Sequence, residues 1–395
     1  MLSAVEFFAG SGLVRLGLQP DFKTVWANDI SEKKRATYIA NFGDETFLLE
    51  SIENISGHSI PSSDLAWASF PCQDLSLAGN MNGMSKGTRS GLFWEWIRVL
   101  WELRAAGRCP SVLAVENVLG FVVAEQGALF REAYSALREL GYKVGAVVIN
   151  ASAFVPQSRQ RAFMIAVRDG VSLHGLTQSS ASGPFHPKAL VEAVRDIDDA
   201  GWVWWSLPSP SKLPRQFSEI CEGDAIANSP KETAHLLTML SPAHRRKLDE
   251  IVASRLPFAG TAYRRTRKDE QGRTVQRLEL RFDGVAGCLR TPDGGSSRQT
   301  VILIKDGRVI TRLLTVRECA RLMGAPESFR LSGSYNDAYR AMGDGVAVPV
   351  TRWISANLLT VLALRASGTE SNENINDGWD KTQHVSSNSE LHLYV

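Results

Sequence analysis

The sequence predicts an α/β fold, in which a doubly wound, Rossmann-like sheet is joined to a second, smaller domain of irregular structure. Three observations lead to this prediction. Short apolar runs alternate with helical patterns over the first 170 residues or so, which is typical of a parallel sheet covered by helices on both faces. Polar or acidic residues follow several of these runs, at the strand ends where such sheets bind ligands. Serine, proline and glycine then become frequent between about residues 170 and 310.

The predicted strands begin almost at the N-terminus. The first, Ser3–Phe8, leads into the glycine-rich turn AGSG and then into the helical pattern LVRLGLQ. The later strand candidates are Thr24–Ala27, Leu65–Ser69, Val112–Val115, Lys143–Ile149 and Ala162–Val167, and the helices between them include Leu92–Ala106 and Ala128–Leu140. Strands and helices thus alternate as a doubly wound sheet requires.

These patterns divide the chain into four parts. We expect a first domain over residues 1–170, a smaller irregular domain over 171–312, a return to the first domain over 313–365, and a disordered polar tail over 366–395. The smaller domain carries the basic runs His244–Lys247 and Arg264–Lys268, and the return begins with a well-patterned helix, Thr315–Met323.

Composition excludes several classes of protein. The 395 residues are 44% hydrophobic and 22% charged, as in ordinary globular proteins, and a net charge of +2 neither requires nor excludes a nucleic-acid partner. Five widely spaced cysteines without a CxxC pair argue against a disulfide framework and against a metal site, so we expect a reducing, cytoplasmic compartment. We expect no membrane span, because the sequence has no run of eighteen apolar residues. We also expect no signal peptide, because no basic segment followed by an apolar run stands at the N-terminus.

Two features at strand ends suggest a bound nucleoside. The glycines of the turn Phe8–Gly12 would let the backbone approach a ligand, although a tight turn without a ligand explains them equally well. Asp29, at the end of the next strand, could accept hydrogen bonds from both ribose hydroxyls or simply cap a helix. A further acid, Asp64, lies beside Leu65 at a third strand. The turn, Asp29 and Asp64 together favour a nucleoside-containing cofactor.

Cys72 is the candidate nucleophile. An isolated cysteine is usually a small buried hydrophobe, but this one follows a proline at a strand end and precedes a long, Gly- and Ser-rich loop, 74–90, of the kind that forms lids. A cysteine nucleophile needs a lowered pKa and a partner that stabilises the adduct. Glu116, at the end of another strand, is a candidate acid, and Arg159 and Arg161 are candidate cations.

Taken in order, these segments resemble the DNA cytosine-C5 methyltransferases. The motifs that carry the resemblance are FAGSG, ND, DL, FPCQ, ENV, QSRQR, TVRECARLMGAPESF and MGDGVAVPV. Each motif is weak alone, but eight in the family's order are not a plausible coincidence. The resemblance implies a methyltransferase domain that uses S-adenosylmethionine, and a small target-recognition domain. It also implies transfer of the methyl group to C5 of a flipped cytosine in a specific sequence of double-stranded DNA.

The resemblance also implies a biological setting. We expect an enzyme of a restriction-modification system, or one derived from it, with a cognate restriction endonuclease as a candidate companion that acts separately. We further expect a monomer that is associated with the nucleoid when it is bound to DNA.

The resemblance assigns the catalytic roles residue by residue. Cys72 matches the nucleophile that adds to C6, Glu116 matches the acid at N3 and the exocyclic amine, and Arg161 and Arg159 match the arginines near the base. The residues expected to contact the cofactor are Phe8, Ala9, Gly10, Ser11, Gly12, Asp29, Ile30, Asp64, Leu65, Pro71, Asp344 and Val346. Two of these depart from the family pattern, since Asp29 stands where Glu is more frequent and Asp344 replaces the Asn of Gly-Asn-small-Val.

The middle region predicts the DNA contacts, because sequence choice needs side chains at base edges and positioning needs cations at phosphates. Residues 294–299 combine glycines with Arg298 and Gln299, which suit guanine and adenine edges, although a turn with an exposed arginine is the alternative. The expected DNA contacts are Gln73, Ser76, Lys86, Arg89, Arg265, Arg267, Gly295 and Arg298. The aromatic segment 202–205 is expected to pack between the two domains rather than to stack on bases.

Two other functions stay open on the sequence. The first is an RNA methyltransferase of the same fold, which the long basic middle region disfavours. The second is a DNA-binding protein without activity, which would have no need of Cys72, Glu116 and Arg161.

Overall fold

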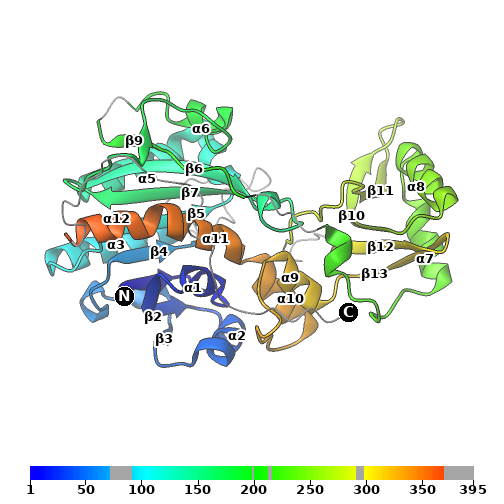
Figure 1. Cartoon of the computed structure of the whole chain (residues 1–395), viewed down its shortest axis with the longest axis horizontal. Helices are drawn as coiled ribbons and strands as arrows, with labels where there is room; N and C mark the ends of the chain where they lie inside the picture. The colour runs from blue at the N-terminus through cyan, green and yellow to red at the C-terminus, as the bar shows by residue number, and fades with distance from the viewer. Residues whose placement is uncertain (72–90, 198–199, 212–215, 291–297, 369–395) are drawn as a thin grey trace.

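The chain forms two lobes that are joined by a narrower connection (Figure 1). The computed structural model describes residues 1–71, 91–197, 200–211, 216–290 and 298–368. The larger lobe contains both the N-terminal part of the chain and the helices that follow the smaller lobe, so the chain leaves the larger lobe and later returns to it.

The larger lobe is built on a sheet in which the described strands lie in the order β3-β2-β1-β4-β5-β7-β6-β9-β8. Strands β1 to β5 pair in parallel, β7 is antiparallel to both β5 and β6, and β9 is parallel to β6. Their bounds are β1 Leu2–Phe7, β2 Phe22–Asp29, β3 Phe47–Leu49, β4 Leu65–Ala68, β5 Val112–Asn117, β6 Tyr142–Asn150, β7 Gln160–Arg168, β8 Thr177–Gln178 and β9 Trp202–Trp205. The order reverses at β1, which places a ligand crevice outside the carboxyl ends of β1 and its neighbours.

Helices cover both faces of this sheet because its central strands are apolar on both sides. In β1, Ala4 packs into the core on one face and Val5 into the core on the other, and neither is exposed. The helices of the larger lobe are α1 Leu13–Leu18, α2 Glu32–Phe42, α3 Gly91–Ala105, α4 Leu119–Val123, α5 Ala128–Glu139, α6 Lys188–Ala193, α9 Val316–Leu322, α10 Tyr335–Gly343, α11 Val348–Ile354 and α12 Thr360–Ala366. Side chains of α1, α11 and α12 belong to one core, and those of α3 and α5 belong to the other. The doubly wound prediction is confirmed.

The smaller lobe is a four-stranded antiparallel sheet in the order β11-β10-β12-β13, with two helices beside it (Figure 1). Its elements are α7 Pro230–Thr238, α8 Pro242–Ser254, β10 Phe258–Lys268, β11 Thr274–Leu280, β12 Thr300–Lys305 and β13 Arg308–Leu313. A small core of its own includes Leu248 of α8 and Ile302 of β12. The middle domain is therefore more regular than its composition indicates.

The predicted boundary at residue 170 is wrong, because β8, α6 and β9 still belong to the larger lobe. Strand β9 extends the large sheet by pairing with β6. Trp202 of β9 packs edge-on against Phe130 and Tyr134 of α5, and Trp205 is fully buried. The aromatic segment 202–205 therefore packs within the larger lobe and not between the lobes.

A buried ion pair joins the last strand of the smaller lobe to the returning helices. Arg312 of β13 contacts both carboxylate oxygens of Glu318 in α9, at 2.7 and 2.6 Å, and the two side chains are 2% and 0% exposed. The same carboxylate accepts hydrogen bonds from the backbone N–H groups of Glu222 and Thr315. This network satisfies the buried charges and fixes the point where the chain re-enters the larger lobe.

The return predicted over 313–365 contains α9 to α12, and all of the predicted tail beyond Gly368 lies outside the described residues. Within the described residues, the helical stretch Tyr335–Ala366 is long enough and apolar enough, with a mean hydropathy of 1.4, to span a membrane. However, 61% of the apolar 18-residue window within it is buried inside the protein, where the stretch contributes to the larger lobe's core. Such burial is typical of a core helix.

Candidate active site

A large cavity opens at the carboxyl ends of the parallel strands, as the topology predicts. Its volume is about 1040 Å³, and it is lined by the segments that follow β1, β2, β3, β4 and β5, by the start of β7, by the end of α10, and by residues 288–290 from the smaller lobe. Known small-molecule sites usually measure about 300–1,000 Å³. This cavity is thus large enough for more than one small ligand.

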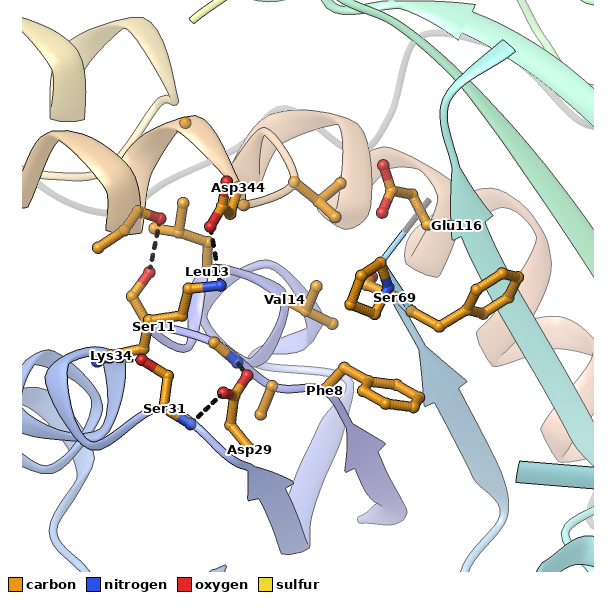
Figure 2. A pocket seen from close by; sticks show the side chains of 18 of the residues that line it. Phe8, Ser11, Leu13, Val14, Asp29, Ser31, Lys34, Ser69, Glu116 and Asp344 are labelled. Carbon is orange, nitrogen blue, oxygen red and sulfur yellow. Dashed lines mark hydrogen bonds and ion pairs between the residues drawn. The ribbon is translucent and has the colours of Figure 1, made fainter. Parts of the chain in front are cut away.

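The turn after β1 forms one wall of the cavity. Phe8, Gly10 and Gly12 have positive φ values of 58°, 57° and 84°, which turn the chain sharply from the strand into α1. A Cβ atom at Gly12 would lie 2.4 Å from the ring of Phe42 in α2, so only glycine fits there. The turn therefore brings its backbone and the Phe8 side chain to the cavity (Figure 2).

Asp29, the last residue of β2, holds this turn in place. Its Oδ2 accepts a hydrogen bond from Gly10 N at 2.9 Å, and its Oδ1 accepts one from Ser31 N at 2.8 Å (Figure 2). Each carboxylate oxygen retains a lone pair, and the residue lines the cavity. Asp29 thus acts both as a clamp on the turn and as a candidate acceptor for a ligand hydroxyl.

Most of the residues predicted to contact the cofactor lie around this one cavity. The lining includes Phe8, Ala9, Gly10, Ser11, Asp29, Ile30, Pro71, Asp344 and Val346. Ile30 is 72% exposed, so a large apolar side chain faces the open cavity where a flat ring could cover it. Gly12 shapes the turn without lining the cavity.

Across the cavity, Glu116 at the end of β5 pairs with Arg161 of β7. Glu116 Oε1 lies 2.9 Å from Arg161 Nε, and the two side chains are only 7% and 15% exposed. Beside Glu116, Asn117 donates a hydrogen bond of 3.2 Å to the carbonyl oxygen of Phe70, and Pro71 lines the cavity. The end of β5 is thereby bonded to the residues directly before Cys72. Cys72 itself lies outside the described residues.

The family model of the C-5 cytosine-specific DNA methylases matches residues 2–360, which is nearly the whole chain. The chain belongs to this family.

Bacterial relatives agree with the family match. The type II methyltransferase M.Bsp6I of Bacillus sp. (strain RFL6) is 27% identical over 365 residues, which cover 91% of this chain and 98% of the relative. The type II methyltransferase M.HhaI of Haemophilus parahaemolyticus is 26% identical over 365 residues, which cover 90% and 94%. The chain is thus a DNA (cytosine-5-)-methyltransferase, similar over its length to enzymes of restriction-modification systems.

Solved structures agree on the fold. The S. pombe Dnmt2 methyltransferase has a TM-score of 0.57 and 16% identity, over 94% of this chain and 100% of that one. A Spodoptera frugiperda DNMT2 mutant has a TM-score of 0.57 and 19% identity, over 92% and 99%. At such low identities the likeness shows the fold alone.

Within this methyltransferase, the assignment of Asp64 and Leu65 to the cofactor site is wrong. Asp64 precedes β4, at the amino end of the strand, where its Oδ2 accepts hydrogen bonds from Ser3 N and Ser3 Oγ at 2.7 and 2.8 Å. Leu65 is fully buried in the core. Both therefore lie at the edge of the sheet opposite the cavity, because parallel strands present their carboxyl ends to the ligand side.

The cavity is lined instead by Glu50, Ser51 and Ile52, which directly follow β3. Sequence reasoning missed them because the apolar run of β3, Phe47–Leu49, has only three residues and is too short to be recognised as a strand. The signal that could have found them is the polar pair Glu50 and Ser51, which follows a short apolar run at about the distance along the chain where one more strand of the sheet is expected.

Arg159 lines the cavity, but backbone carbonyl groups bind most of its guanidinium. Its Nη2 donates to the carbonyl oxygens of Gly343 and Gly345 at 2.9 and 2.7 Å, and its Nη1 donates to the carbonyl oxygen of Leu289 at 3.0 Å. The side chain is 2% exposed. Arg159 therefore connects the end of α10, on the cofactor side of the cavity, to the segment that descends from the smaller lobe.

Gln157, two residues earlier, makes a similar connection that sequence reasoning did not single out. Its Nε2 donates to the carbonyl oxygen of Leu322 at 2.8 Å, and its Oε1 accepts from Leu289 N at 2.9 Å. Gln157 is fully buried. In the motif QSRQR, the alternate residues Gln157 and Arg159 thus hold the two lobes together, and Arg161 faces the cavity.

Cys288 is a described cysteine whose side chain lines the cavity. Burial by itself raises the pKa of this thiol, but the nearby guanidinium groups of Arg159 and Arg161 outweigh burial and leave the pKa below its usual value. Arg159 Nη1 also donates a 3.2 Å hydrogen bond to the sulfur. The thiol is therefore part of the polar floor of the cavity, which is where a reacting group would meet positive charge.

The smaller lobe contributes a basic face that is continuous with the cavity wall. On β10, Tyr263, Arg265 and Arg267 point to the same side, because side chains alternate along a strand. Tyr263 donates a hydrogen bond to the carbonyl oxygen of Cys288, which lines the cavity. Arg265 and Arg267 share the carboxylate of Glu279 at 3.1 and 2.6 Å and remain 38% and 47% exposed.

The structure places the predicted reading residues Arg298 and Gln299 inside protein contacts. Arg298 donates to Asn336 and lies over the ring of Tyr335, 5.3 Å from its centroid. Gln299 is fully buried and exchanges two hydrogen bonds with the backbone of Gly287. Gln299 is therefore not a reader of base edges, and a DNA contact by Arg298 stays a prediction. The predicted DNA contacts Gln73, Ser76, Lys86, Arg89 and Gly295 lie outside the described residues.

Proposed function

We propose that this methyltransferase uses S-adenosylmethionine to methylate C5 of a cytosine flipped out of double-stranded DNA, through a covalent bond between Cys72 and C6. The observation that carries the proposal is the Glu116–Arg161 pair, held 2.9 Å apart in the same cavity as the turn after β1 and Pro71. An acid, a cation and the approach to a cysteine therefore share one cavity with a candidate nucleoside site.

The residues of the turn fit S-adenosylmethionine. Gly10 leaves room for a ligand against the backbone, Asp29 offers carboxylate lone pairs to ribose hydroxyls, and Ile30 offers an apolar surface to the adenine ring. When bound, S-adenosylmethionine would supply an electrophilic methyl group on a sulfonium. The cavity volume of about 1040 Å³ leaves space for a pyrimidine base beside such a cofactor.

The chain's own residues supply the remaining chemistry. C5 of cytosine is too weak a nucleophile to attack the sulfonium methyl group directly. The Cys72 thiolate would therefore add to C6 first and shift electron density to C5. Glu116, sharing a proton with N3, would stabilise the charge that develops on the ring. Arg161 holds the Glu116 carboxyl in position. Once C5 has bonded to the methyl group and the thioether has left, loss of the C5 proton and expulsion of Cys72 would restore the aromatic ring.

Flipping the base is required because C5 and C6 cannot be reached inside a duplex, and it costs a few kcal/mol of stacking and pairing. Cationic contacts to the DNA backbone would offset this cost. Arg265 and Arg267, on the basic face next to the cavity, are the described candidates for such contacts.

The test compares the wild-type chain with Cys72→Ser. The wild type should transfer labelled methyl groups from S-adenosylmethionine to duplex DNA, and Cys72→Ser should transfer none while it still binds the same DNA. Activity retained in Cys72→Ser would overturn the covalent mechanism. Transfer of label to tRNA but not to DNA would instead favour the RNA methyltransferase.

The relatives' names as type II methyltransferases support a role for this chain in restriction-modification. We propose that it acts as a monomer, because one flipped base occupies one cavity. Sedimentation of the DNA-bound protein tests this, since a complex with two protein chains would contradict it.

A further inference from the structure

A charged pair, Lys34 and Asp344, spans the cofactor side of the cavity. Lys34 in α2 and Asp344 at the end of α10 both line the cavity, and Lys34 Nζ lies 2.8 Å from Asp344 Oδ2. The two side chains are 26% and 36% exposed, so both remain accessible to a ligand. Figure 2 shows Asp29 on one side of the turn and Asp344 on the other, with the Lys34 ammonium reaching Asp344.

Lys34 is held directly over the turn. Its Cδ atom lies 3.9 Å from the position that a Cβ would take on Gly10, the residue whose N–H donates to Asp29. Burial by itself would lower the pKa of Lys34, but the carboxylates of Asp344 and Asp29 outweigh burial and raise the pKa. The ammonium therefore stays charged in the cavity, within reach of both carboxylates.

The acidic residue at position 344 lies at the end of a helix where a negative charge is disfavoured. Asp344 is the C-cap of α10, and a carboxylate at the negative end of a helix dipole is unfavourable. The family pattern noted above has a neutral Asn at this position. Lys34 offsets the charge, so this chain has an ionic pair where a neutral side chain would cap the helix.

We propose that Lys34 and Asp344 together recognise the zwitterionic amino-acid end of S-adenosylmethionine, with Lys34 binding its carboxylate and Asp344 its ammonium group. This inference rests on the cofactor named under the proposed function. An α-amino acid presents one positive and one negative group close together, which matches a pair whose charged atoms lie 2.8 Å apart.

Other charges in the cavity are less suited to this role. Glu116 and Arg161 bind each other on the opposite wall, and Arg159 is buried among backbone carbonyls. Separating Lys34 from Asp344 costs little, because partly exposed ion pairs contribute little to stability. The ligand would thus exchange one weak internal ion pair for two pairs with the cofactor.

The experiment measures how the full-length chain binds two cofactor analogues by calorimetry. S-adenosylhomocysteine carries the amino-acid end, and 5′-methylthioadenosine lacks it. Lys34→Met should weaken S-adenosylhomocysteine binding about tenfold or more and change 5′-methylthioadenosine binding less than about twofold. Asp344→Asn, which restores the family's residue, should show the same selectivity in a smaller degree. Decarboxylated S-adenosylmethionine should bind Lys34→Met and the wild type equally, because it has no carboxylate.

The matched control is Lys33→Met. Lys33 is the adjacent lysine and also lines the cavity, but it is 70% exposed and pairs with Asp337 instead of Asp344. This variant should therefore bind both analogues as the wild type does. The inference is overturned if Lys34→Met weakens both analogues equally, which would make the pair structural, or if it weakens neither. A wild-type chain that binds neither analogue would instead overturn the proposed cofactor itself.

Discussion

Replacing Arg159 with methionine separates a positioning role from a catalytic role. Methionine fills most of the volume of the arginine stem but cannot donate hydrogen bonds. Three backbone carbonyls, on Leu289, Gly343 and Gly345, would lose their guanidinium donor, as would the thiol of Cys288. Arg159→Met should therefore loosen two chain segments at once, one on each side of the cavity.

The size of the effect follows from this count. A buried acceptor left without a donor costs about 1–3 kcal/mol. The low end applies because water can enter from the adjoining cavity, and three carbonyls then give about 3 kcal/mol. Urea denaturation should show this loss, and S-adenosylhomocysteine binding should weaken, because Gly343 and Gly345 flank Asp344.

Arg161→Met is the matched control, since the same substitution is made two residues away. Arg161 contacts Glu116 at the open cavity, so this variant should lose methyl transfer with a smaller loss of stability and nearly normal S-adenosylhomocysteine binding. The reasoning is refuted if Arg159→Met unfolds at the wild-type urea concentration, binds S-adenosylhomocysteine normally and yet fails to methylate. That result would mean that Arg159 touches the substrate.

Three further predictions concern other parts of the molecule. Glu116→Gln should lower the methyl-transfer rate by about 10²–10⁴-fold while S-adenosylhomocysteine binding is kept, and an active variant would exclude Glu116 as the acid. Arg312→Met should destabilise the chain in urea by about 3–5 kcal/mol, because Glu318 would stay buried without its partner; an unchanged midpoint would contradict this. Burial raises the pKa of Glu6 to about 7, so the folded chain keeps a proton that the unfolded chain releases, and stability should fall as pH rises from about 5 to 7. Glu6→Gln should remove this dependence of stability on pH, and at about pH 8 its free energy of unfolding should exceed that of the wild type by about 3 kcal/mol. A wild-type stability that stays constant between about pH 5 and 7 would contradict the raised pKa of Glu6.

The parts of the fold that were predicted correctly are those with a strong local signal. The alternation of apolar strands and helices gave the doubly wound sheet, and polar residues at strand ends gave Asp29 and Glu116, which line the cavity. Such signals work because one strand and its following turn carry the information. The pairing of Glu116 with Arg161 needed the antiparallel β7 beside β5, which no local pattern reveals.

The errors arose where tertiary context decided the outcome. Asp64 is an acid next to a strand, but at its amino end, and only the strand direction separates the two cases. Gln299 has a side chain suited to a base edge but is used to pair the backbone of Gly287. The boundary after residue 170 was placed too early because β8 and β9 are short and are joined to the sheet by pairing with distant strands.

The measurement that tests the central claim most directly is bisulfite sequencing of DNA from cells that express the chain, with Cys72→Ser as the paired control. We predict that cytosines in one recurring sequence resist conversion in cells with the wild type and that the same cytosines convert with Cys72→Ser. Complete conversion in both, from cells that contain the folded wild-type chain, would contradict the claim that this chain methylates C5 of cytosine in DNA.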